Sequence, residues 1–299
     1  MLDVPVFKGI ATALVTPFCK DGIDYAHLAE IIEFQLTHGA DALVVCGTTG
    51  ESPVLTTDEK KELFDFAVRQ TRHRVPVIAG TGGSDVKTAC LLSEYACGAG
   101  VSALLVVTPY YNKTTPKGLI RTYEAISSAS DKPIIVYNVP SRTGVNVTPE
   151  QYAELAEIPR VEAVKEASND VSKLAEAMSL CHGKLRFYSG SDELLLPFLS
   201  LGGDGVISVA SNIVPKEMKK LYVSFVSGDI ERAAETQSAL TPLEKLLFCE
   251  TNPVPVKTAL HYMGLCEKMF RLPLCEMAEE NEKLLVNELA KRGLIPGKK

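Results

Sequence analysis

Eight short apolar runs recur along the chain, and each is followed by a segment with a helical pattern. The runs are continuous rather than alternating in polarity, and most are rich in valine and isoleucine, which is typical of strands covered on both faces. Repeated alternation of strand and helix predicts an α/β fold with a parallel sheet, and eight units are the number that closes a (β/α)8 TIM barrel. An open doubly wound sheet is the alternative. The runs begin near Gly9, Ala40, Val75, Ser102, Pro133, Val161, Leu185 and Gly205.

Capping residues predict where several helices begin. Residues 56–59 and 148–151 match the capping box, in which a threonine and a later Glu or Gln satisfy each other's main-chain N–H groups. Asp24 precedes an apolar stripe at helical spacing, and Gly39 follows it, as expected for the two ends of one helix. The stripe consists of Leu28, Ile31, Ile32 and Leu36.

The last quarter of the chain has helical patterns and no strand pattern. We expect residues 1–227 to form the catalytic barrel domain and residues 228–299 to form a C-terminal α-helical appendage of roughly three helices. The clearest patterns cover residues 230–248 and 274–289. No linker rich in Gly, Ser or Pro separates the two parts, so the appendage should pack firmly on the barrel.

Composition and charge exclude several classes of protein. The 299 residues carry 31 basic and 37 acidic side chains, whereas a nucleic-acid-binding protein needs a basic face. No apolar run approaches the roughly 18 residues of a membrane-spanning helix. The N-terminal residues lack a basic segment followed by an apolar block, so we expect no signal peptide.

The cysteines and histidines show no metal-binding pattern. None of the eight cysteines forms a Cys-x-x-Cys pair, and five lie in apolar segments (46, 90, 97, 181 and 249), which predicts reduced, mostly buried thiols in a cytoplasmic protein. The five histidines lack metal-ligand spacing, and the glycine-rich residues 80–83 and 202–205 lack the spacing of a nucleotide-binding loop. We therefore expect neither a catalytic metal nor a cofactor.

Lys165 is the most unusual residue of the predicted strands. Side chains alternate along a strand, so Ala163, Lys165 and Ala167 share one face, and the two small alanines leave room for one long side chain. Burying an ammonium costs free energy, and a neutral amine is a nucleophile that forms a Schiff base with a ketone or aldehyde. The alternative is a structural ion pair with Glu162 or Glu166, although these side chains point to the opposite face.

Three further polar segments follow predicted strands at the end where barrel enzymes hold their active sites. In residues 47–51 two glycines allow a tight turn, and the N–H groups and hydroxyls of this turn can bind a carboxylate. The alternative is that the segment only connects a strand to a helix. After the fifth strand, Tyr137 can move protons and Arg142 can bind a carboxylate, or they are a core tyrosine and a solvated arginine. Residues 108–113 carry two tyrosines, which at the tip of a loop often mark an interface with another chain. The alternative is that the two rings only pack within the loop.

These segments and their order along the chain resemble those of a known family. GTTGE, TPYYN, YNVPSRTG and VEAVKEAS follow one another, and GSDE and GGDGVISVASN come after them. Over essentially the whole chain they resemble the dihydrodipicolinate synthase family of the pyruvate-dependent class I aldolase superfamily, which includes N-acetylneuraminate lyase. The resemblance implies a lyase with 4-hydroxy-tetrahydrodipicolinate synthase activity. Such an enzyme condenses pyruvate with L-aspartate 4-semialdehyde in diaminopimelate and lysine biosynthesis.

The resemblance also implies roles for individual residues. Lys165 corresponds to the lysine that forms the Schiff base with pyruvate, and Tyr137 to the tyrosine that donates and accepts protons. Thr49, with Thr48 beside it, corresponds to the turn that binds the pyruvate carboxylate and joins the proton relay. Tyr111 corresponds to a tyrosine that completes the relay of a neighbouring subunit.

Two further residues correspond to substrate-binding positions. Arg142 matches the arginine that binds the semialdehyde carboxylate, and Ile207 matches the residue whose main-chain carbonyl faces bound pyruvate. Neuraminate lyases typically lack this arginine and carry Ser-Thr in place of Thr48 and Thr49, so these residues favour the synthase. The alternatives are another pyruvate-dependent aldolase, such as a neuraminate lyase or a keto-deoxy-sugar aldolase, and a barrel without enzymatic activity.

The resemblance has implications for regulation and assembly. Family members that lysine inhibits carry His, Asn and Glu in a cleft between subunits, where this chain has Thr57, Lys60, Ser84 and Thr88. These residues offer no carboxylate to a cationic effector, so we predict weak or absent lysine feedback. The family also implies a homotetramer built as a dimer of dimers, with the two substrates as its other partners.

Overall fold

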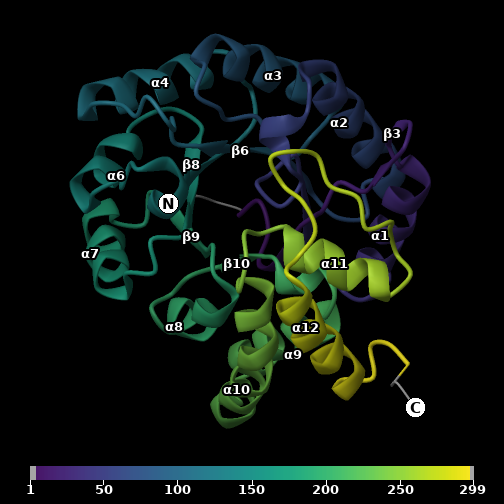
Figure 1. Cartoon of the computed structure of the whole chain (residues 1–299). Helices are drawn as coiled ribbons and strands as arrows, with labels where there is room; N and C mark the ends of the chain where they lie inside the picture. The colour runs from purple at the N-terminus through teal and green to yellow at the C-terminus, as the bar shows by residue number, and fades with distance from the viewer. Residues whose placement is uncertain (1–4, 297–299) are drawn as a thin grey trace.

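The computed structural model describes residues 5–296, and in that part of the chain eight parallel strands close into a barrel surrounded by helices (Figure 1). The predicted TIM barrel is confirmed, and the open doubly wound sheet is wrong, because the first strand pairs with both the second and the last barrel strand. Residues 1–4, which entered the signal-peptide prediction, lie outside the described part. The barrel strands are β1 (Gly9–Ala13), β4 (Ala42–Val45), β5 (Val77–Gly80), β6 (Ala103–Val107), β7 (Ile134–Asn138), β8 (Val161–Glu166), β9 (Arg186–Ser189) and β10 (Gly205–Ser208).

Helices connect successive barrel strands and form the outer ring seen in Figure 1. They are α1 (Tyr25–Thr37), α2 (Thr57–Thr71), α3 (Val86–Ala99), α4 (Pro116–Ser128), α5 (Pro140–Thr143), α6 (Pro149–Leu155), α7 (Val171–Cys181), α8 (Leu195–Ser200) and α9 (Pro215–Val226). Three short 3-10 helices and a small hairpin complete this part of the chain: η1 (Ser52–Val54), η2 (Asp192–Leu194), η3 (Ala210–Asn212), β2 (Phe18–Cys19) and β3 (Gly22–Ile23).

The helix starts predicted from capping residues are confirmed. The carboxylate of Asp24 accepts a main-chain N–H of the first turn of α1 at 3.0 Å. Thr56 and Glu59 satisfy each other's main-chain N–H groups at the start of α2, and Thr148 and Gln151 do the same at the start of α6. Local side-chain chemistry therefore fixes these boundaries.

Three helices follow the barrel within the described residues: α10 (Ile230–Leu247), α11 (Val254–Tyr262) and α12 (Glu279–Lys291). They gather on one side of the ring, where α10 packs on α9 and α12 packs on α10 and α11 (Figure 1). The predicted helix over residues 274–289 is wrong at its start, because residues 274–278 are not helical. The acidic residues Glu279, Glu280 and Glu282 occupy the first turn of α12, where the helix dipole favours negative charge.

Apolar side chains form two layers. One lies between the strands and the outer helices, and the other fills the barrel interior. On β7, Ile134 and Val136 face the helices, whereas Ile135 and Tyr137 face the interior. This alternation follows from the period of two residues in a strand.

The cysteine prediction is confirmed in part. All eight cysteines are free, but only Cys46, Cys181 and Cys266 are buried. Cys249 is exposed although its segment is apolar, because it follows the C-terminal end of α10 and the preceding Phe248 is itself 48% exposed. In residues 5–296 no helix has both the length and the apolar character needed to cross a membrane. The same residues contain no group of three or more His, Cys, Asp or Glu side chains placed to hold a metal ion.

Candidate active site

Two adjoining cavities open at the carboxyl ends of the barrel strands. The larger cavity, of about 390 Å³, is lined by Lys165 together with residues of the loops and of the C-terminal helices. The smaller cavity, of about 200 Å³, lies over the ends of β4 to β7. Tyr137, Val139 and Arg142 line both, so the two cavities are parts of one site.

Lys165 lies on β8 with its side chain inside the barrel mouth. The side chain is only 5% exposed, and its Nζ lies 4.4 Å from the ring centroid of Tyr137, the residue opposite it on β7. Ala163 and Ala167 belong to the same interior face, as the alternation of the strand predicts. The two residues proposed for Schiff-base formation and proton transfer are therefore direct neighbours.

The structural alternative for Lys165 is not realised. Glu166 faces outward, where it accepts hydrogen bonds from Tyr152 Oη at 2.5 Å and from Asn138 Nδ2 at 3.0 Å. Within the described chain no carboxylate, including that of Glu162, forms an ion pair with Lys165. A buried amine beside a tyrosine and an open cavity is placed to react with a carbonyl group.

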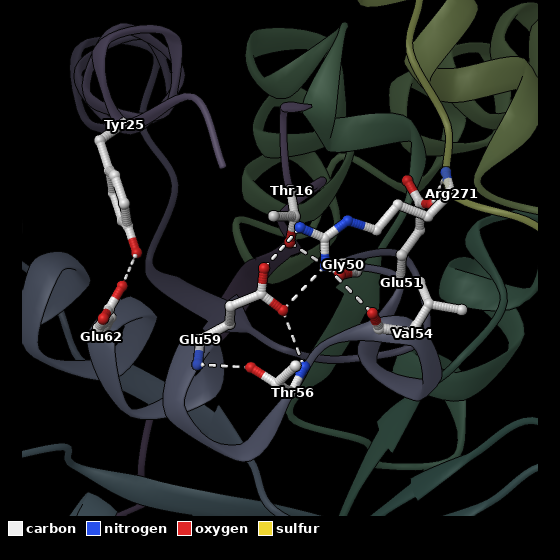
Figure 2. Close-up of polar contacts among 9 residues, drawn as sticks. All are labelled: Thr16, Tyr25, Gly50, Glu51, Val54, Thr56, Glu59, Glu62 and Arg271. Carbon is white, nitrogen blue, oxygen red and sulfur yellow. Dashed lines mark hydrogen bonds and ion pairs between the residues drawn. The ribbon is translucent and has the colours of Figure 1, made fainter. Parts of the chain in front are cut away.

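The turn after β4 brings both threonines to the site. Thr49 lines the larger cavity and is 2% exposed, whereas Thr48 lines the smaller one. The hydroxyl of Thr49 accepts a hydrogen bond from Asn252 Nδ2 at 3.1 Å. Thr16 Oγ1 donates to the carbonyl oxygen of Gly50 at 2.8 Å, as Figure 2 shows. The turn is therefore held from the segment after β1 on one side and from the segment between α10 and α11 on the other.

A buried ion pair also holds this turn. Glu51, which has a positive φ of 55°, pairs with Lys257 of α11 at 2.5 Å, and neither side chain is exposed to solvent. Arg271 pairs with Glu59 at 2.5 Å and donates to the carbonyl of Val54 at 3.1 Å (Figure 2). That contact with Arg271 lowers the pKa of the Glu59 carboxyl to about 2.

Arg142 lies at the mouth of the site. The residue is exposed, lies on the short helix α5 and lines both cavities. Its Nη2 donates to the main-chain carbonyl of Asn252 at 3.1 Å. A guanidinium at this entrance can bind a carboxylate through its planar set of donors.

Three carboxyl groups in the wall of the larger cavity, those of Asp192, Glu193 and Glu244, were not identified from the sequence as site residues. Burial raises the pKa of Asp192, whose Oδ2 accepts the N–H groups of Val209 and Ala210 at 3.0 and 2.9 Å. Burial and the charges of Asp192 and Glu193 raise the pKa of Glu244 on α10 to about 8. Asp192 lies in the GSDE segment quoted above, but Glu244 lies on a helix that carries no recognisable motif.

Two predicted site residues do not line the cavities. Tyr111 has a positive φ of 66° and is 95% exposed, whereas its neighbour Tyr110 lines the smaller cavity. Ile207 on β10 is fully buried in the barrel interior beside Ala11. The fold thus brings together Lys165, Tyr137, Thr48, Thr49 and Arg142, and it leaves Tyr111 and Ile207 outside the lining.

The glycines at residues 80–83 have a packing role. A Cβ atom on Gly80 would collide with the main-chain carbonyl of Cys46, and one on Gly82 would collide with the main chain of Val107. Both glycines line the smaller cavity. Close backbone approach therefore explains two of the three glycines of this segment, Gly80 and Gly82.

The comparisons with known proteins agree with this geometry. A model of the Dihydrodipicolinate synthetase family matches residues 6–292. A protein named 4-hydroxy-tetrahydrodipicolinate synthase from Thermoanaerobacter sp. (strain X514) is 47% identical over 293 residues, which cover 98% of this chain and 99% of the relative. A protein of the same name from Clostridium tetani (strain Massachusetts / E88) is 45% identical over 291 residues, which cover 97% and 99% of the two chains. The crystal structure of dihydrodipicolinate synthase from Aquifex aeolicus is similar with a TM-score of 0.95 at 43% identity, and the match covers 97% of this chain and 100% of that one.

Proposed function

The chain belongs to the dihydrodipicolinate synthetase family and is a lyase of the 4-hydroxy-tetrahydrodipicolinate synthase type, and we propose on this premise how its residues carry the reaction. The substrates are pyruvate and L-aspartate 4-semialdehyde, and the product enters diaminopimelate and lysine biosynthesis. The synthase name of the relatives supports this activity and not that of another pyruvate-dependent aldolase.

The proposal depends above all on one observation, the buried amine of Lys165 beside Tyr137. In its neutral form Lys165 attacks the ketone carbon of pyruvate, and loss of water leaves a Schiff base. The imine then acts as an electron sink, so that the methyl group loses a proton and an enamine forms. The enamine carbon attacks the aldehyde of the semialdehyde, and its carbonyl oxygen takes up the proton. Attack by the amino group on the imine carbon then closes the ring and releases Lys165.

Tyr137 and the threonines are proposed to move the protons of these steps. Tyr137 gives and takes protons at the imine and alkoxide stages, and Thr49 links it to a tyrosine relay. The turn that contains Thr48 and Thr49 also binds the pyruvate carboxylate, through its main-chain N–H groups and the Thr48 hydroxyl, so that the Thr49 hydroxyl serves the relay. The support is that both threonines and Tyr137 line the joined cavities that contain Lys165.

Arg142 is proposed to bind the carboxylate of the semialdehyde. Its exposed position at the entrance supports this role, because the second substrate must enter after the imine has formed. The main-chain carbonyl of Ile207 is proposed to face bound pyruvate, and the support is that Val209, directly after β10, lines the larger cavity.

Tyr111 is proposed to complete the relay of a second subunit, in a homotetramer built as a dimer of dimers. An aromatic side chain that is 95% exposed supports such a contact. We also propose the domain division given above, at residue 227, and a cytoplasmic location. The eight free cysteines support a reducing compartment.

Reduction with borohydride in the presence of pyruvate tests the role of Lys165. We expect the native protein to gain one pyruvate adduct on Lys165 by mass spectrometry, and Lys165→Ala to gain none. A coupled assay with dihydrodipicolinate reductase and NADPH then measures turnover with the semialdehyde, with N-acetylmannosamine and glyceraldehyde as competing acceptors. Turnover only with the semialdehyde supports the synthase reaction. An adduct without such turnover would keep Lys165 as the nucleophile and reject the second substrate.

A further inference from the structure

Asn252 makes two contacts that join the proposed substrate-binding groups. It lies between α10 and α11, is 5% exposed and lines the larger cavity. Its side-chain Nδ2 donates to Thr49 Oγ1 at 3.1 Å, and its main-chain carbonyl accepts from Arg142 Nη2 at 3.1 Å. One residue of the C-terminal part of the chain thus touches the groups proposed to bind two different substrates.

In the contact between Asn252 and Thr49, the asparagine donates and the threonine accepts. This limits where the hydroxyl hydrogen of Thr49 can point. A threonine hydroxyl has one hydrogen to donate and two lone pairs with which to accept. Because Asn252 donates to Thr49, the hydroxyl hydrogen of Thr49 points elsewhere, and Thr49 faces the cavity that Tyr137 also lines. An amide does not change its protonation at ordinary pH, so a change of pH does not reverse this direction.

A second observation indicates that the amide serves the cavity. The other side-chain atom, Oδ1, is buried and accepts no hydrogen bond from residues 5–296. Buried polar atoms in proteins are normally paired, so an amide that only completed the fold would have both ends satisfied. Asn252 instead has one end bonded to Thr49 and the other without a partner among the described residues.

We propose that Asn252 is a positioning residue, whose amide directs the hydroxyl hydrogen of Thr49 into the cavity and toward the Tyr137 relay. The proposal rests on the proposed function, because Asn252 acts through Thr49. The bond from Arg142 keeps the main chain of Asn252 in place. Asn252 itself transfers no proton.

The variant Asn252→Asp tests the direction of this hydrogen bond. A carboxylate has the same shape but only accepts hydrogen bonds, so it takes the Thr49 hydrogen for itself. We expect kcat to fall by about 10- to 100-fold, within the range for disturbed proton transfer. The KM for pyruvate and the yield of the borohydride-trapped adduct should change by less than about twofold, because the relay is not needed to hold pyruvate.

A double-mutant cycle with Thr49→Val separates this role from a structural one. In the Thr49→Val background, Asn252→Asp should cost less than about another twofold in kcat, because its target is gone. In the Thr49→Ser background, which keeps the hydroxyl, the full loss should remain. If Asn252→Asp does not fold, Asn252→Ala replaces it in the same double-mutant cycle.

Asn281→Ala is a matched control. Asn281 Nδ2 holds Glu250 at 2.8 Å, so its loss loosens the same segment without touching Thr49. We expect its kcat to stay within about twofold of the native value. Equal losses from Asn252→Asp in the native and Thr49→Val backgrounds, or a raised KM for pyruvate with native kcat, would overturn the inference. A native protein that forms no pyruvate adduct would instead contradict the proposed function itself.

Discussion

Glu244 is protonated in the wall of the larger cavity at neutral pH, because its pKa is raised to about 8. An unfolded chain ionises this carboxyl near its ordinary value of 4.5. Between these two pH values the folded state binds the additional proton, so the free energy of unfolding falls as pH rises. Below this window the group is protonated in both states and adds no pH dependence.

Glu244→Gln should remove this slope. The amide has the same shape, stays neutral and can still accept a hydrogen bond from Gln237, which contacts Glu244 at 3.2 Å. We expect the variant to gain stability over the native protein between pH 5 and pH 8, by at most about 1.4 kcal/mol per pH unit. Urea denaturation at pH 5, 6.5 and 8 measures the difference. Parallel curves for the two proteins would contradict the assignment.

Arg142→Ala should separate the two substrates. We expect kcat/KM for the semialdehyde to fall by about 100-fold or more, which corresponds to the roughly 3 kcal/mol of a charge-assisted bidentate contact. Pyruvate should still be trapped on Lys165 with borohydride. Equal loss of imine formation and of semialdehyde turnover would mean that Arg142 holds the site together instead of binding a substrate.

The residue scale also shows what the sequence can predict. Lys165 could be identified because its signal is local: a charged residue between two alanines on an apolar strand. Asn252 and Glu244 could not, because each lies in a segment that is ordinary by itself. Asn252 can be assigned to the site only from its contact with Thr49, which lies 203 residues away in the chain.

At the scale of elements, the turn after β4 is held by segments distant in sequence. Glu51 is paired with Lys257 of α11, and Arg271 reaches from the segment before α12 to Glu59 and Val54 (Figure 2). Burial lowers the pKa of Lys257, and the charge of Glu51 opposes that effect. Removing one partner would leave the other charged and buried without compensation.

Lys257→Met should therefore destabilise the fold by about 3–5 kcal/mol, because Glu51 loses its counter-ion. The double variant Glu51→Gln with Lys257→Met should recover most of that loss, since no uncompensated charge remains. Chemical denaturation measures both. A double variant no more stable than Lys257→Met alone would show that the packing of Lys257 over Phe18, 4.0 Å from its ring centroid, matters more than charge.

Elements differ in how well the sequence predicts them. The barrel strands and the capped helices follow from hydrophobic pattern and from side chains within one turn, and they are confirmed. The start of α12 was misplaced, because the apolar residues before it pack on the core without forming a helix, as Leu274 and Met277 do. The hairpin of β2 and β3 was not predicted, since two strands of two residues each carry no periodic signal.

At the scale of the whole molecule, Tyr111 is 95% exposed and lines neither of the two joined cavities. The proposed relay needs it in a neighbour, so we expect sedimentation of the active enzyme to show at least a dimer. Tyr111→Phe should keep the assembly and reduce kcat by about 10-fold or more, because it removes only a hydroxyl. A fully active monomer would exclude the shared relay.

The prediction of weak lysine feedback also belongs at this scale, because it concerns the proposed cleft between subunits. Lys60 is partly desolvated, so that burial lowers its pKa, and the hydroxyl of Thr88 is bonded to Asp85 at the start of α3. Neither residue offers a free carboxylate to a cation. We expect millimolar L-lysine to leave the rate in the coupled assay within about twofold of its starting value. Strong inhibition would contradict this expectation.

The late position of Asn252 in the chain has a consequence for protein synthesis. A ribosome adding about 5–20 residues per second joins Asn252 roughly 4–17 s after Lys165. During that interval the emerging polypeptide already contains Lys165, Tyr137 and the turn at residues 47–51. It does not yet contain Asn252, which contacts Thr49, or Lys257 and Arg271, which hold the turn. On the proposed mechanism, a chain synthesised only as far as Leu247 therefore lacks three of the contacts that hold the turn after β4.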